Sequence, residues 1–188
     1  SSNTVAGYAS CGAGVGPTAL DQIVGVVKAY TTRVGNGPFP TELLDACGDN
    51  LRQIGNEYGA TTGRNRRCGW FDAPVVRKAA MVNGLTHLAI TKLDVLDTFD
   101  SIKICTAYKC DGETLDLIPN QLSKVGRCEP VYEEMPGWKQ DTTACKSWDE
   151  LPENAKNYLK RLAELVDVKI GMVSVGARRD QSIIIDME

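Results

Sequence analysis

The sequence lacks the features that define several large classes of protein. It contains no run close to the roughly 18 apolar residues of a membrane-spanning helix, and no basic segment followed by an apolar one, as in a signal peptide. Its 21 Lys and Arg are outnumbered by 24 Asp and Glu, so it has none of the basic surplus of a general nucleic-acid binder. We therefore expect neither a membrane nor a nucleic acid as its partner.

Metal-ligand and phosphate-loop patterns are also missing. None of the seven cysteines forms a C-x-x-C pair, which argues against a structural zinc site, and the phosphate loop G-x-x-x-x-G-K-[ST] does not occur. Cys47 and Cys105 have apolar neighbours, where cysteine packs as a small hydrophobe, so we expect reduced thiols in a cytoplasmic protein. The single histidine, His87, is predicted to be a core or surface residue rather than a catalytic one.

What is present predicts a globular α/β protein. The chain has 188 residues, 43% of them hydrophobic and 24% charged, which is enough for one domain with a sizeable core. Apolar residues at helical spacing predict helices over residues 17–30, 42–57 with an interruption at Gly48, 74–83 and 156–166. Residues 1–16 are predicted to form a loop, and strands are predicted over 85–90, 102–108, 131–136, 168–173 and 182–186. This alternation favours an α/β sheet covered by helices on both faces.

An arginine-rich segment is the most informative part of the chain. Arg64, Arg66 and Arg67 lie within four residues, with no lysine or acid among them. A guanidinium group donates pairs of hydrogen bonds to carboxylates and phosphates, and the neighbouring hydroxyls and glycine backbone add neutral donors. This composition predicts a loop that holds a small polyanion, with an exposed basic turn as the alternative. We call residues 60–66 the arginine loop; its members are Ala60, Thr61, Thr62, Gly63, Arg64, Asn65 and Arg66.

Two further segments place polar or small residues after a predicted strand. The first contains Lys92, Leu93 and Asp94, and its Asp could accept hydrogen bonds from N1–H and the exocyclic amine of guanine, while a strand-end ion pair is the alternative. The second, Ser174, Val175 and Gly176, is a small-residue turn whose backbone amides could contact a base carbonyl. Taken with the arginine loop, the two segments predict a site for a guanine nucleotide beside another anionic ligand.

At this point the chain resembles a known family. The segments SSNTVAG, KAYTTRVGNGPFPTEL, YGATTGRNRRCGWFD, NGLTHLAITKLDVLD and SVGARRDQSI are similar, in order and spacing, to motifs in the C-terminal part of adenylosuccinate synthetase. The resemblance runs almost from end to end. One departure is the pair Ala177 and Arg178, where the family is expected to have Pro and often an acid, and this loosens the assignment of that turn.

The resemblance implies a reaction and a set of contacts. In that family GTP phosphorylates O6 of IMP, and the amine of L-aspartate then displaces the phosphate, with Mg²⁺ as cofactor. The full-length enzyme would be a homodimer. The arginine loop would bind aspartate, Arg64 would also reach the IMP ribose, and Val34 would line the IMP pocket through its backbone. Arg66 would lie between aspartate and the GTP phosphates, and the remaining GTP contacts would be Lys92, Leu93, Asp94, Ser174, Val175 and Gly176. The implied fold is part of a P-loop-NTPase-like, mostly parallel sheet.

The family's phosphate loop G-D-E-G-K-G, with its catalytic Asp, and its catalytic His do not occur in this sequence. We therefore expect residues 1–188 to be a C-terminal portion of the catalytic domain, without catalytic or metal-binding residues and inactive alone. The start at Ser1, without Met, agrees with a segment of something longer. Two alternatives stay open: a non-catalytic guanine-nucleotide-binding module, and a structural subunit that pairs with a separate N-terminal chain.

Overall fold

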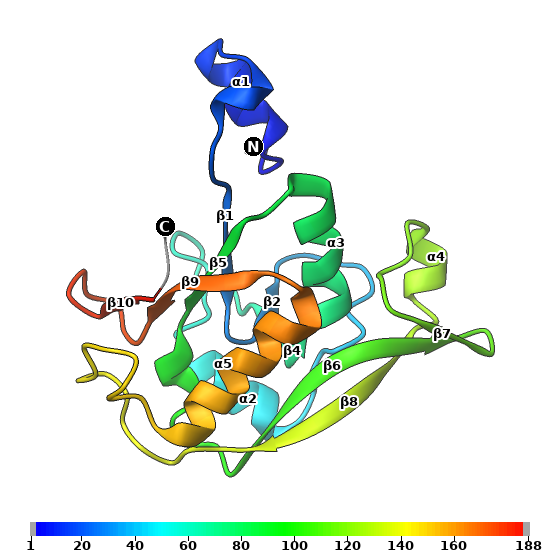
Figure 1. The fold of residues 1–188 in the computed structure, drawn as a ribbon. Helices are drawn as coiled ribbons and strands as arrows, with labels where there is room; N and C mark the ends of the chain where they lie inside the picture. The colour runs from blue at the N-terminus through cyan, green and yellow to red at the C-terminus, as the bar shows by residue number, and fades with distance from the viewer. Residues whose placement is uncertain (1–2, 186–188) are drawn as a thin grey trace.

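The computed structural model describes residues 3–185 (Figure 1). It contains helices and strands that alternate along the chain, with two short 3₁₀ turns. The helices and turns are α1 (Gly7–Ala13), η1 (Pro17–Ala19), α2 (Ala46–Ile54), α3 (Ala73–Asn83), η2 (Leu93–Leu96), α4 (Leu122–Val125) and α5 (Glu153–Val166). The strands are β1 (Val24–Lys28), β2 (Thr31–Arg33), β3 (Arg67–Gly69), β4 (Phe71–Asp72), β5 (His87–Thr91), β6 (Ser101–Cys110), β7 (Glu113–Leu115), β8 (Glu129–Pro136), β9 (Lys169–Ser174) and β10 (Ser182–Ile184).

The sheet that positions the predicted nucleotide site has the order β1-β5-β9-β10. Strands β1, β5 and β9 are parallel, and β10 is antiparallel to β9. Four of the five residues of β5 are buried, as expected for the central strand of a parallel sheet. The α/β class with parallel strands, predicted from the alternation of helices and strands, is therefore confirmed.

A second sheet is largely antiparallel. Its long strand β6 pairs with β8 from Ser101↔Pro136 to Lys109↔Glu129, while β7 lies on the other edge of β6 and β4 is parallel to it. Figure 1 shows β6 and β8 as an extended ribbon whose far end carries β7 and α4. A third, small sheet pairs β2 with β3 and brings residues 31–33 against residues 67–69.

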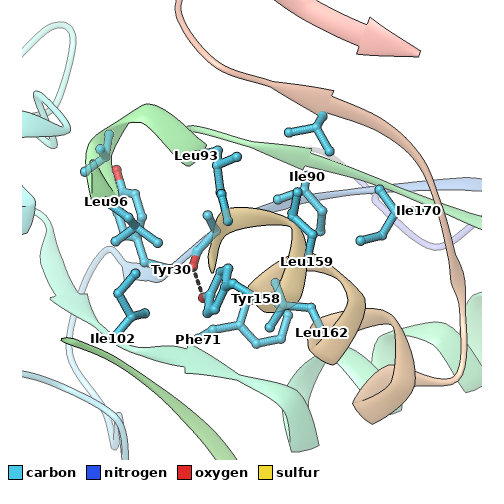
Figure 2. Packing of buried hydrophobic residues seen from close by; sticks show 14 of the residues in the cluster. Tyr30, Phe71, Ile90, Leu93, Leu96, Ile102, Tyr158, Leu159, Leu162 and Ile170 are labelled. Carbon is cyan, nitrogen blue, oxygen red and sulfur yellow. Dashed lines mark hydrogen bonds between the residues drawn. The ribbon is translucent and has the colours of Figure 1, made fainter. Parts of the chain in front are cut away.

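Helix α5 closes the core. Tyr158, Leu159 and Leu162 are fully buried at helical spacing and pack among apolar residues of the parallel sheet and of β4 and β6 (Figure 2). The Tyr158 hydroxyl donates a 2.6 Å hydrogen bond to the backbone oxygen of Ala29, just after β1. This bond satisfies a buried donor and fixes the helix over the end of the strand.

Several sequence predictions agree closely with the structure, among them the strands predicted over 102–108 and 131–136, which lie within β6 and β8. The helix predicted over 74–83 is α3, which begins after Asp72, whose carboxylate accepts from the Val75 amide, and ends at Gly84 with φ +62°. The helix predicted over 156–166 forms the larger part of α5, and the strand predicted over 168–173 is β9 with a one-residue shift. The strand predicted over 182–186 ends at Ile184, and Asp186 lies outside the described residues.

The helix predicted over 17–30 is wrong. Only Pro17–Ala19 form a helical turn, and Val24–Lys28 form β1. The apolar spacing fits a helix, but β-branched Val24, Val26 and Val27 favour a strand, and pairing with β5 settles the outcome.

The other two differences concern helix limits. The predicted loop over 1–16 contains α1, and the helix predicted over 42–57 shortens to α2, capped by Asp45. Gly48 does not interrupt α2: it lies inside the first turns, where a Cβ would come within 2.2 Å of the Leu43 oxygen.

In the described part of the chain, no helix is long and apolar enough to cross a membrane. The seven cysteines are all unpaired, and five of them are buried. His87 is buried at the start of β5, where its Nδ1 lies 3.0 Å from the Thr86 hydroxyl, so it is a core residue.

We expect the 188-residue chain to unfold cooperatively in urea, because β1, β5 and β9 are hydrogen-bonded neighbours within one core. Leu159→Ala should lower its free energy of unfolding by about 2–5 kcal/mol, since the side chain is fully buried. Leu44→Ala is the matched control: Leu44 is 90% exposed, and its loss should change stability by no more than about 0.5 kcal/mol. If Leu159→Ala and Leu44→Ala lowered the free energy of unfolding equally, or if the chain showed no cooperative transition in urea, this packing would be contradicted.

Candidate functional site

The arginine loop is a short, exposed reversal of the chain. A bridge between Tyr58 and Asn65 closes its base, and the Gly59 amide donates a 2.8 Å hydrogen bond to the Arg64 oxygen. Gly63 has φ +63° with open space around it, a backbone conformation that side chains disfavour. The loop is thus held at its base while residues 60–65 face solvent.

The two predicted ligand-binding arginines of this loop differ in their surroundings. Arg64 is exposed, and its guanidinium has no partner among residues 3–185. Arg66 is half-buried, and its Nη1 donates a 2.7 Å hydrogen bond to Oε2 of Glu57. Arg64 is therefore free to take an anion from solvent, whereas Arg66 is held in place by a carboxylate.

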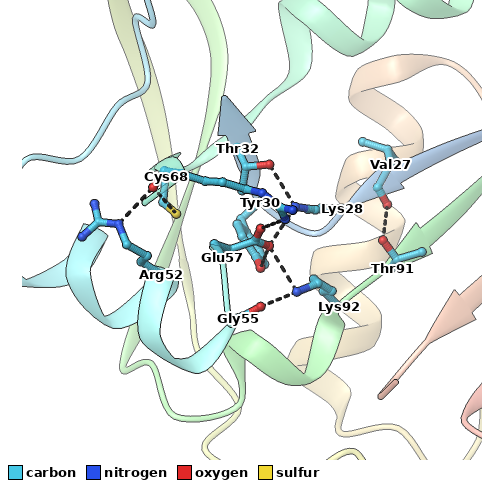
Figure 3. A network of polar contacts seen from close by, with 11 residues as sticks. Val27, Lys28, Tyr30, Thr32, Arg52, Gly55, Glu57, Cys68, Thr91 and Lys92 are labelled. Carbon is cyan, nitrogen blue, oxygen red and sulfur yellow. Dashed lines mark hydrogen bonds and ion pairs between the residues drawn. The ribbon is translucent and has the colours of Figure 1, made fainter. Parts of the chain in front are cut away.

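Glu57, which the sequence did not single out, is the centre of a polar network (Figure 3). Its side chain is 0% exposed and contacts three cations. Oε1 accepts from Lys28 Nζ at 2.7 Å and from the Tyr30 hydroxyl at 2.5 Å, and it lies 3.2 Å from Lys92 Nζ. The network therefore joins the end of β1, the arginine loop and the segment after β5.

The same network sets the charge states of its members. Burial alone raises the pKa of Glu57, but hydrogen bonds from Lys28, Tyr30 and Arg66 outweigh burial and bring the pKa down to about 2. Burial and the Glu57 carboxylate together raise the pKa of Tyr30 far above its usual value. At neutral pH the network thus consists of an ionised carboxylate, a neutral phenol and its cations.

The predicted guanine-binding residues lie at the ends of adjacent parallel strands. Ile90 of β5 pairs with Val173 of β9, so the segments that follow them, 92–94 and 174–176, leave the sheet side by side. Lys92 has φ +61°, and this left-handed turn starts η2. The pattern is that of open α/β sheets, in which ligands bind beyond the carboxyl ends of the strands.

Asp94 carries an unused hydrogen-bonding group. Its Oδ1 is buried and has no hydrogen-bond partner within residues 3–185. Burial raises the pKa of this carboxyl, and its own backbone amide and Lys92 oppose that shift. A buried acceptor without a partner is costly, so a ligand that donates a hydrogen bond there would be bound selectively.

The turn after β9 is well ordered by its own hydrogen bonds. The Ser174 hydroxyl donates to the Gly176 oxygen at 2.8 Å, and the Val175 amide donates to the Gln181 oxygen at 2.9 Å. A Cβ on Gly176 would lie 2.2 Å from Oε1 of Gln181, so the turn requires glycine unless that side chain moves. At the departure from the family pattern, the Arg178 amide donates to the same Oε1.

A cavity of about 620 Å³ opens beside Asp94. Asp97 and Thr98 also line it, and its far side is a loop that the sequence did not reveal, which contributes Lys139, Gln140, Asp141 and Thr143. Asp97 anchors that loop, because its carboxylate accepts from Trp138 Nε1 at 2.6 Å and from the Thr142 amide at 2.7 Å. The anchor depends on residues more than 40 positions apart, and no local pattern signals it.

Val34 lies one residue beyond β2, at the base of the arginine loop. The pair Arg33–Arg67 ends the β2–β3 ladder, which brings Val34 close to Arg66. Its side chain is 71% exposed. The structure thus joins Arg66 and Lys92 through one network and sets Val34 beside Arg66. Arg64 and the two threonines occupy the exposed loop, and Ser174–Gly176 lie at the end of β9.

Within residues 3–185, no three His, Cys, Asp or Glu side chains are placed to hold a metal ion. Mg²⁺ takes carboxylate and other oxygen ligands. No cluster of three such carboxylates is found among the residues described.

Comparison with known proteins finds a family model, similar sequences and a similar structure. The family model for adenylosuccinate synthetase matches residues 1–183. Similar proteins include adenylosuccinate synthetase of Trichlorobacter lovleyi, 59% identical over 98% of this chain, and that of Picosynechococcus sp., 59% identical over 99%. A structure of fully ligated adenylosuccinate synthetase from Plasmodium falciparum is 41% identical, covers 99% of this chain and has a TM-score of 0.94.

This chain covers 43% and 42% of those two relatives and 45% of the Plasmodium chain, so it spans less than half of each. The match nevertheless includes every segment on which the resemblance rested. The chain belongs to the adenylosuccinate synthetase family.

Proposed function

We propose that this chain supplies the aspartate-binding loop and the guanine pocket of an enzyme that ligates L-aspartate to IMP at the expense of GTP. The observation that carries the proposal is the unpartnered, buried Oδ1 of Asp94 beside the turn after β9. Guanine offers N1–H and an exocyclic amine to a carboxylate, whereas adenine presents an acceptor at N1. Family membership and the neighbouring arginine loop support the same assignment.

In this proposal the arginine loop positions the nucleophile. Arg64, with no partner of its own in the described part, grips an aspartate carboxylate and reaches the IMP ribose, and Thr61 and Thr62 add hydroxyl and amide donors. Arg66 lies between aspartate and the GTP phosphates, and Val34 contacts IMP through its backbone. The aspartate amine is thereby held near O6 of IMP, the atom that GTP phosphorylates and from which the amine displaces phosphate.

The guanine pocket would be formed by Lys92, Leu93 and Asp94 from one strand end and by Ser174, Val175 and Gly176 from the other. These residues bind and orient GTP, and none of them is assigned a bond-breaking role. The catalytic Asp and His and the Mg²⁺ ligands belong, in this proposal, to the part of the relatives that the chain does not span. A homodimer in the cytoplasm completes the proposal, as the resemblance implies.

The direct test compares two proteins in an adenylosuccinate assay. One is the 188-residue chain, for which we expect no product. The other is a chimera in which this chain replaces the matching part, 43% of the length, of the Trichlorobacter lovleyi relative, and we expect it to form adenylosuccinate from IMP, GTP and aspartate. Product from the chain alone would contradict its expected inactivity. GTP binding by the chimera without ligation would favour the non-catalytic module.

Arg64→Leu in the chimera should raise the KM for aspartate by about 10- to 100-fold, because it removes hydrogen bonds between charged groups worth about 1.5–3 kcal/mol. Steady-state kinetics at saturating GTP and IMP measure the change. Arg127→Leu is the control, since Arg127 is an exposed arginine that pairs with Asp111 near α4. An unchanged KM for aspartate would show that the arginine loop has another ligand.

Asp94→Asn in the chimera should raise the KM for GTP and reduce the preference for GTP over ITP. An amide offers one acceptor where the carboxylate offers two, and ITP lacks the exocyclic amine that the second acceptor would take. Competition between GTP and ITP in one assay measures this preference. Asp100→Asn is the control, because the side chain of Asp100 is 88% exposed. A preference that stays as in the unsubstituted chimera would rule out Asp94 as the base-reading residue.

A further inference from the structure

The buried carboxylate of Glu57 lies between the two sites proposed above. Its Oε2 is taken by Arg66 of the arginine loop, and its Oε1 by Lys28 and, at 3.2 Å, by Lys92 of the guanine pocket. Lys92 also donates to the backbone oxygen of Gly55, two residues before Glu57. One side chain therefore contacts a residue from each of the two sites, and Figure 3 labels Glu57 with one of them, Lys92.

The backbone of Glu57 belongs to the same arrangement. Its carbonyl oxygen accepts a 2.9 Å hydrogen bond from the Arg66 amide, and the next residue, Tyr58, forms the bridge that closes the arginine loop. Glu57 thus holds Arg66 through both main chain and side chain. A change at the Glu57 carboxylate would be transmitted to the loop without any movement of distant elements.

The exposure of the partners indicates why this contact matters for ligands. The Glu57 side chain is 0% exposed, whereas those of Arg66 and Lys92 are 31% and 35% exposed. The side chains of Arg66 and Lys92 therefore both contact Glu57 and remain partly accessible to solvent. Lys28, Arg66 and Lys92 carry three positive charges against one negative charge, a net charge of +2 that favours anionic ligands on the solvent side.

We propose that Glu57 is a positioning residue that fixes Arg66 and Lys92 for their ligands and couples the aspartate and guanine sites. This inference rests on the proposed function of those sites. Because water does not reach the carboxylate, the loss or gain of one cation changes its attraction for the others. A coupling of this kind is reciprocal: a ligand bound at Lys92 changes the affinity for a ligand at Arg66, and a ligand bound at Arg66 changes the affinity at Lys92 to the same extent.

The test uses Glu57→Gln in the chimera, with KM for aspartate, KM for GTP and kcat measured separately. We expect both KM values to rise by about tenfold, within the usual range of coupling between sites. Glu42→Gln is the matched control, since Glu42 pairs with Arg67 in the adjacent β2–β3 sheet, with Oε1 2.7 Å from Arg67 Nε, and neither residue is assigned to a ligand. We expect Glu42→Gln to change either KM by less than about twofold.

Two further variants separate positioning from a merely structural role. Glu57→Asp keeps the negative charge, so it should raise the KM for aspartate and the KM for GTP less than Glu57→Gln does. Lys92→Gln should raise the KM for aspartate as well as that for GTP, because Glu57 without Lys92 attracts Arg66 more strongly. If Glu57→Gln fails to fold, Lys92→Gln decides the question.

The outcomes are distinguishable. An active chimera in which Glu57→Gln behaves like Glu42→Gln, or in which Lys92→Gln changes the KM for GTP alone, would overturn the coupling and leave the proposed function standing. An unsubstituted chimera without ligase activity would overturn the proposed function, and the coupling with it.

Discussion

The carboxylate of Glu57 imposes the strongest physical constraint in this chain, because a charge removed from water must find its partners inside the protein. Four side chains, those of Lys28, Tyr30, Arg66 and Lys92, converge on it. Its pKa is about 2 in the folded chain, below the usual value near 4.5. The carboxylate therefore stabilises the fold fully above that usual value, and the stabilisation is lost as the pH falls toward 2.

The other positions of the site follow from strand register. Parallel pairing of β5 with β9 places residues 92–94 beside residues 174–176, although about 80 residues separate them in the sequence. Antiparallel pairing of β2 with β3 brings Val34 to the base of the arginine loop. Rigid sheets thus set the location of each segment, and the Glu57 network links the segments that leave the sheets.

The sequence predicted those elements for which local signals agree. Helix α3 combines an Asp cap, Pro near its start and Gly at its end, and α5 has a clear apolar face. Residues 17–30 mislead, because helical spacing competes with β-branched residues and only pairing with β5 decides. Helices and strands still alternate along the rest of the chain, so the α/β class was predicted correctly although one helix was misassigned.

The ligand-binding segments could be predicted only as separate pieces. Arginine composition marked residues 60–66, and the strand-end pattern marked Asp94. Nothing in the sequence singles out Glu57, because its importance depends on three cations brought together by folding, and Lys28 and Lys92 are 64 residues apart. The loop over residues 139–143 escaped notice for the same reason, since Asp97 and Gln181, both far away in sequence, hold it.

The outer edge of β1 has a consequence of a different kind. In the described part of the chain β1 pairs with β5 alone, and Val26 on this strand is 75% exposed. Beside it lies an apolar groove of about 550 Å³ to which Ile23, Val75 and Leu85 contribute. The unpaired N–H and C=O groups of an edge strand can pair with a strand of another chain. We therefore expect association of the folded chain to increase with its concentration, because a more stable core leaves this strand edge uncovered.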